Sequence, residues 1–174
     1  MSFAEGRDVI KSVINRYEGV RREAVRGLPQ AKSVVFNIVA DILYRIERTL
    51  EYLSELEKAI GASGIGFKRS CGNLLLIKAG DAVTALKLKP IQALTYSREG
   101  SSVSLSNDTV KVTVSGASVK FVFRGREIEF NYTNLDDAVA KVDIIKAIAR
   151  YAIDLADRLQ LCIEQCAKLH NIRL

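Results

Sequence analysis

Apolar residues recur at helical spacing up to residue 60 and then switch to alternation with polar ones. Residues 3–26 form one amphipathic stripe, and the Gly27-Leu28-Pro29 segment stops it. Residues 30–60 repeat apolar positions three and four apart, which predicts a second, longer helix with a heptad seam made by Val35, Val39, Ile42, Ile46, Thr49, Leu53, Leu56 and Ile60.

Alternation is clearest in the stretch that predicts strands at 101–106, 109–115, 118–124 and 126–132. Pairing outward from the turns puts apolar residues opposite each other on one face: Leu105 opposite Val110, Val103 opposite Val112, Val112 opposite Phe121, Val114 opposite Val119, Phe121 opposite Ile128 and Val119 opposite Phe130. On the other face Lys120 is expected to pair with Glu129.

The preceding stretch is less regular and predicts strands at 65–71, 74–79 and 82–89, with the pattern interrupted at Pro90 and at 97–100. These three strands are expected to form an antiparallel set that continues the meander or packs on it. The predicted fold is α+β, with helical ends around an antiparallel sheet.

A third helix is predicted over residues 136–171, with a zipper-like repeat. Two interpretations stay open: the repeat joins copies of the chain, or it packs against residues 30–60. The first would make 1–135 an α+β nucleic-acid-binding domain and 136–174 a helix for packing and oligomerisation, through Ile148, Leu155, Leu159, Cys162, Cys166 and Leu169.

Composition argues against an enzyme, because the chain has one histidine, His170, and no nucleotide-binding or zinc-protease motif. Cys162, Cys166 and His170 share a helix face but lack a fourth ligand, so we expect no metal and no cofactor. Neither a signal peptide nor an apolar run of about 20 residues is visible, so we expect a cytoplasmic protein without membrane contact.

The net charge of +6 is concentrated in the predicted sheet. Residues 63–134 hold ten basic and five acidic residues, whereas residues 1–62 and 135–174 are close to neutral. An electrostatic partner is therefore expected at the sheet.

Basic, apolar and aromatic residues share one predicted face of the first strands, a combination that suits bases stacking beside neutralised phosphates. We predict binding of single-stranded DNA, or less favourably RNA, with little sequence preference. The candidates on and around this face are Phe67, Lys68, Arg69, Lys78, Lys87, Lys89, Tyr96 and Arg98, and those of a second basic face are Lys111, Lys120 and Arg124. The alternatives are that Phe67 belongs to the core and that the cations protect strand edges from aggregation.

The element order and the Ile148, Leu155, Cys162, Leu169 series resemble the ThermoDBP-related single-stranded DNA-binding proteins of archaea. The resemblance implies a homo-oligomer, a dimer or tetramer, paired through the C-terminal helix, with single strands held against an exposed apolar and basic cleft or between subunits. The lack of Trp and the single Met are typical of thermophiles. A weaker resemblance to the small subunit of archaeal CRISPR effector complexes supports the alternative function, a non-catalytic helical scaffold.

Overall fold

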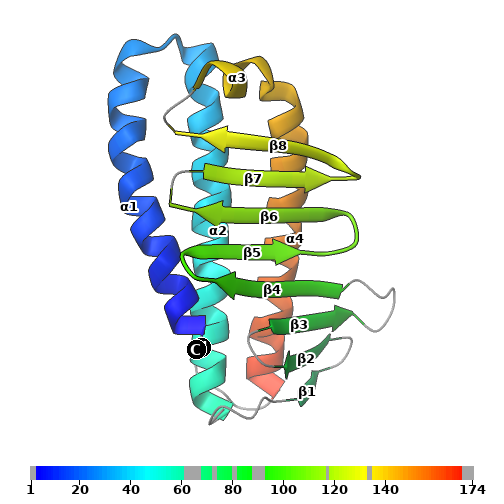
Figure 1. Cartoon of the computed structure of the whole chain (residues 1–174). Helices are drawn as coiled ribbons and strands as arrows, with labels where there is room; N and C mark the ends of the chain where they lie inside the picture. The colour runs from blue at the N-terminus through cyan, green and yellow to red at the C-terminus, as the bar shows by residue number, and fades with distance from the viewer. Residues whose placement is uncertain are drawn as a thin grey trace.

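The protein has an α+β fold in which three long helices lie on a single antiparallel sheet (Figure 1). The computed structural model describes residues 3–60, 68–71, 74–79, 82–87, 93–116, 118–132 and 135–169, and for β1, β2 and β3 it gives the backbone pairing. The elements are α1 (Phe3–Gly27), α2 (Gln30–Ile60), β1 (Lys68–Cys71), β2 (Leu74–Ala79), β3 (Ala82–Lys87), β4 (Ala93–Glu99), β5 (Ser102–Ser106), β6 (Val110–Ser115), β7 (Ser118–Phe123), β8 (Arg126–Asn131), α3 (Leu135–Ala140) and α4 (Val142–Leu169).

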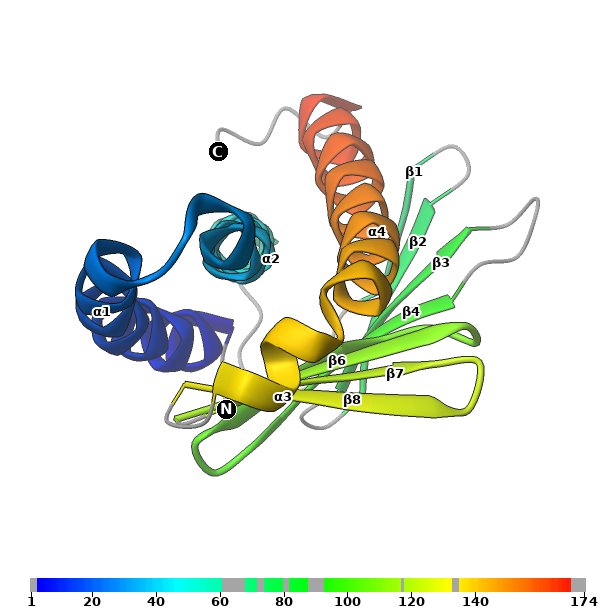
Figure 2. The same ribbon diagram turned by 90° about the horizontal axis from the view of Figure 1, so that it is seen from above.

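The eight strands are hydrogen-bonded in sequence order, each antiparallel to the next. Figure 2 shows α1, α2 and α4 together on one face of this sheet, and Figure 1 shows them running across the strands. A sheet that buries one face alternates buried and exposed residues, as β6 does along its length. The predicted fold class is confirmed.

The core lies between the sheet and the helices. From the sheet, fully buried Val114, Val119, Phe121 and Phe130 meet apolar stripes of α1, α2 and α4 in one cluster. Burying each such side chain contributes about 1.5–3 kcal/mol, so this layer is the main source of stability. Because α4 belongs to the same cluster as the sheet, it is part of this core.

Four aromatic residues pack α1 and α2 against the end of β8. Tyr17 lies 5.1 Å from Tyr132 and 6.2 Å from Phe130 between ring centroids, and Phe36 meets Phe130 edge-on. The Tyr17 hydroxyl donates to the Phe36 carbonyl at 2.5 Å. Burial raises the pKa of Tyr17 far above its ordinary value, since no water is left to solvate a phenolate.

The helix α1 approaches β4 most closely at Gly6. A Cβ added there would stand 1.8 Å from the Tyr96 hydroxyl oxygen. The Phe3 ring packs on the Tyr96 ring, 5.1 Å between centroids, so there is little room for Tyr96 to move away. The absent side chain of Gly6 therefore sets the distance between helix and sheet.

Three sequence predictions need correction. The strand β4 was not expected, and it joins β1–β3 to the meander in one sheet. The register of β5 on β6 is two residues further along than expected, with Leu105 opposite Val112, because the hairpin turns after Asn107, whose N–H donates to the Val110 carbonyl. The C-terminal helix is divided into α3 and α4 at Lys141.

The other predicted pairs, between β6 and β7 and between β7 and β8, are confirmed. Glu129 is indeed the partner of Lys120 in the register, but the ion pair of Lys120 is made diagonally with Glu127, 3.1 Å from Nζ to Oε1.

Replacing Gly6 with alanine should lower the free energy of unfolding by about 1–2 kcal/mol, because overpacking outweighs the gain in helix propensity. Gly19→Ala is the matched control on the same helix, where an added Cβ meets nothing within 4 Å and should stabilise by up to about 1 kcal/mol. Urea denaturation measures both. Equal stabilisation by the two substitutions would contradict the close contact, and Tyr96→Phe should reduce the cost of Gly6→Ala.

Tyr132→Phe should stabilise the protein at pH 7 by about 1 kcal/mol, since the Tyr132 hydroxyl is buried without a hydrogen-bond partner among the described residues. Burial raises the pKa of Tyr132 to about 12. The folded state therefore binds the phenolic proton more tightly than the unfolded state, and stability is lost as the pH rises from about 10 towards 12. Thermal unfolding between pH 7 and 12 should show a shallower alkaline decline in the variant; identical declines would refute this assignment.

Candidate nucleic-acid interface

The predicted binding residues do not form one surface. Tyr96 and Arg98 lie on the helix-facing side of β4, where Tyr96 is 5% exposed. The Arg98 guanidinium pairs with Glu5 of α1, Nη1 to Oε2 3.0 Å. The prediction that Tyr96 is an exposed stacking group is wrong, because the alternation that buries Leu105 continues into β4 and buries Tyr96 beside it.

Strand pairing arranges the residues in rows across the sheet, and alternate rows belong to opposite faces. The remaining candidates fall into both sets of rows. Lys78 pairs with Val83, which pairs with Tyr96, and the alternation puts Arg69 and Lys87 in the same set of rows. By contrast, the row of Lys68 runs through Ile77, Thr84, Thr95 and Ser106 to Lys111. Phe67 and Lys89 lie outside the described residues.

Lys111 and Lys120 lie on the face that turns away from the helices. They line a shallow hollow of about 460 Å³ together with hydroxyl side chains and two carboxylates. Glu127 hydrogen-bonds Lys120 and raises the pKa of that ammonium, so the pair neutralises itself. The middle of this face is therefore balanced in charge, which suits a solvated sheet better than a phosphate site.

Uncompensated charge lies instead at the end of the sheet where the β5–β6 and β7–β8 turns meet. The first turn is rigid because the Asn107 side-chain oxygen accepts the N–H groups of Thr109 and Val110, each at 2.8 Å. The second turn is tied to it by the Arg124 N–H, which donates to the Thr109 carbonyl at 3.2 Å. The two turns therefore form one unit.

Arg124 and Gly125 form the tip of the second turn, with φ of 49° and 77°. Positive φ at both central residues is the type I′ pattern, in which Asn-Gly is the preferred sequence. An arginine in this conformation costs about 1 kcal/mol or more, since its Cβ approaches the following carbonyl. Its guanidinium carbon lies 5.2 Å from the centroid of the Phe123 ring.

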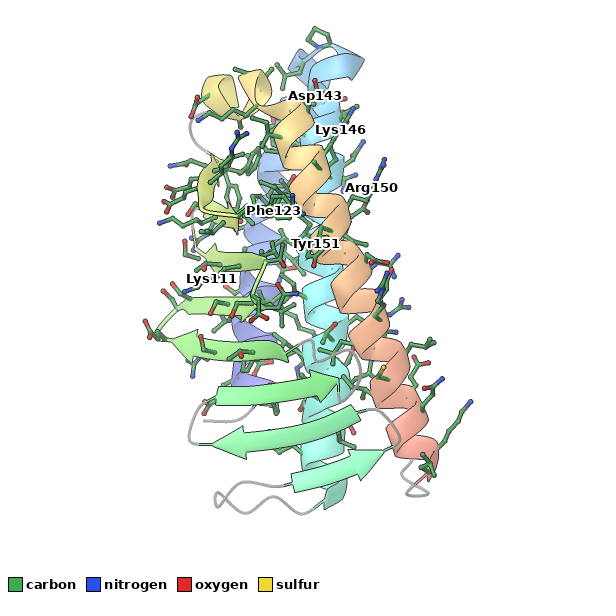
Figure 3. All side chains as sticks on the ribbon, turned by 90° about the vertical axis from the view of Figure 1, so that its right-hand side faces the viewer. Lys111, Phe123, Asp143, Lys146, Arg150 and Tyr151 are labelled. Carbon is green, nitrogen blue, oxygen red and sulfur yellow. The ribbon has the colours of Figure 1, made fainter. Side chains whose placement is uncertain are left out.

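The Phe123 ring in turn meets Tyr151 of α4, with centroids 5.7 Å apart and planes at 61°. Figure 3 shows these two rings directed towards each other, with Lys146 and Arg150 further round α4, whereas Lys111 lies on the other face of the sheet, in the row of Val122. We call Phe123, Arg124, Arg126 and Tyr151 the turn patch. Within the described part of the chain its two cations have no carboxylate within 4.0 Å, and both are exposed.

Sequence reasoning found Arg124 but missed Arg126 and the aromatic pair. Phe123 continues the inward alternation of Phe121, so the alternation alone does not distinguish it from a core position. The Arg-Gly sequence at a two-residue turn is the signal that could have identified this end, because it places an arginine at positive φ.

The zipper-like seam of α4 is used within the chain. Ile148 and Leu159 are buried in the core cluster, and Cys162 is partly buried against it. Arg45 of α2 pairs with Asp157 of α4, Nη1 to Oδ1 2.9 Å, beside this packing. Leu169 is 68% exposed, whereas the side chains of Leu155 and Cys166 lie outside the described set.

Known proteins give no functional guide: comparisons of the chain with protein families, curated proteins and solved structures found no match. Over the described residues, no helix is long and apolar enough to cross a membrane. No group of three or more His, Cys, Asp or Glu side chains in the same residues could hold a metal ion. Among the described residues, the turn patch is therefore the candidate site.

Asn107→Ala should lower the free energy of unfolding by about 1–2 kcal/mol, because two N–H groups lose their acceptor. Asp108→Ala is the control in the same turn, where an exposed side chain is removed and the change should stay within about 0.5 kcal/mol. Equal effects in urea denaturation would contradict the rigid turn.

Proposed function

We propose that the protein binds single-stranded nucleic acid at the turn patch, with little preference for sequence. The observation that carries the proposal is the Phe123–Tyr151 pair, which lies beside two exposed arginines that make no ion pair within 4.0 Å among the described residues. Aromatic rings stack on any unpaired base, with roughly 1–3 kcal/mol per base, while cations follow the phosphates. DNA is the first substrate to test.

Single strands fit this patch better than a duplex does. The bases of a duplex are already stacked on each other, so aromatic rings on the protein give a duplex no comparable contact. The long helices do not offer a basic recognition surface for a major groove, because the exposed side of α4 carries Asp143 and Asp154 as well as Lys146 and Arg150.

The second candidate function, a non-catalytic subunit of a larger assembly, is supported by two exposed side chains on α4. Leu161 is 59% and Leu169 is 68% exposed, which leaves apolar surface for another copy or another protein. This candidate does not require binding to nucleic acid, so a binding experiment separates the two.

Phe123→Trp gives a direct test, because the chain has no natural tryptophan and the new indole would be the sole one. Addition of a single-stranded oligonucleotide should quench its fluorescence as a base stacks on the ring. With two phosphate contacts the logarithm of affinity should fall with a slope of about −1.4 against the logarithm of salt, roughly a sevenfold loss between 50 and 200 mM.

Tyr44→Trp is the matched control: Tyr44 is 45% exposed on α2, and the indole there should not respond. The labelled strand is also followed by anisotropy. If about 50 mM salt gives neither quenching nor a change in anisotropy, the proposed function is wrong and the assembly role is favoured.

A further inference from the structure

Arg124 combines an unfavourable backbone with a contact that occupies the stacking ring. Its φ of 49° lies in the left-handed region, and the bond from its N–H to the Thr109 carbonyl helps to hold that conformation. Its guanidinium lies over the Phe123 ring, where a planar base would stack. A strained residue held by its surroundings is a frequent mark of a functional position.

The side chain is free to leave this position. Arg124 is exposed at the tip of the turn, and within the described residues its guanidinium makes no hydrogen bond or ion pair that would have to break. Phe123 is less free, because it is partly buried and packs on Tyr151. The Arg124 side chain can therefore move at this site, while the Phe123 ring stays in place.

We propose that Arg124 is a displaceable cover: in the free protein its guanidinium shields the Phe123 ring, and on binding it yields the ring to a nucleobase and turns to the neighbouring phosphate. This inference rests on the proposed function. The cover shields the accessible part of a partly buried aromatic ring in the absence of nucleic acid, and the same charge then contributes to binding. A guanidinium suits both tasks, since it stacks on rings and pairs with phosphate.

Covering the Phe123 ring lowers the affinity for nucleic acid, whereas contacting the phosphate raises it. The two effects are distinguished by their different dependence on salt concentration. Displacing the guanidinium from the partly buried Phe123 ring should weaken binding by about two- to fivefold at any salt, the equivalent of ~0.5–1 kcal/mol. The phosphate contact strengthens binding with a salt slope of about −0.7 for a single strand, so its benefit disappears towards 1 M.

Arg124→Asn removes both effects and keeps the turn, because asparagine accepts positive φ readily. Wild type should bind the oligonucleotide more tightly at about 50 mM salt. The affinity curves should cross between about 0.1 and 0.4 M, and above about 0.5 M the variant should bind more tightly. Circular dichroism and thermal unfolding verify that the variant is folded.

Arg126→Asn is the matched control, since Arg126 is exposed on the other side of the same turn. It should reduce the salt slope while remaining no tighter than wild type at every salt concentration. If Arg124→Asn behaves like this control, or changes nothing, Arg124 is not a cover although strand binding stands. If wild type itself binds no strand, the cover is overturned together with the proposed function.

Discussion

The structure depends on one constraint: a single sheet of eight strands has two faces, and the long helices cover one of them. From β5 to β8 the buried apolar positions lie on the helix-covered face, and the pairing of β4 with β5 buries Tyr96 on the same side as Leu105 and Phe121. The opposite face and the ends of the strands are left for solvent and partners. Any function of the sheet has to be sought at those two places.

The same constraint explains why the net charge of the sheet region is a poor guide to where a phosphate would bind. The sheet region holds most of the surplus positive charge of the chain, yet alternation distributes it over both faces. Arg98 meets Glu5 of a helix on one side, and Lys120 meets Glu127 on the other. What determines attraction for phosphate is the charge without a partner on one continuous surface, and the turn patch has that property among the described residues.

Sequence patterns predicted the helices, the fold class and the register of β6, β7 and β8, because side-chain period and short turns determine them. They did not predict β4, where a charged residue, Arg98, occupies a helix-facing position and interrupts the alternation. The shift of β5 on β6 follows from the Asn107 turn, and the helix-facing position of Tyr96 follows from the pairing of β4 with β5, with Gly6 of α1 leaving room for the ring. Both depend on contacts between distant or irregular segments, which local periodicity does not contain.

The turn patch was missed for a related reason: its two rings come from β7 and α4, far apart in the sequence. At the end of a strand, alternation no longer determines burial. A residue there can occupy a helix-facing position and still be partly exposed. Rigid turns then matter more than periodicity, because they determine where the last side chain of each strand lies. In this protein the hydrogen bonds to the Asn107 side chain and the bond from the Arg124 N–H to the Thr109 carbonyl provide that rigidity. They hold the Phe123 ring and the Arg124 guanidinium side by side, where a single-stranded nucleic acid could reach both.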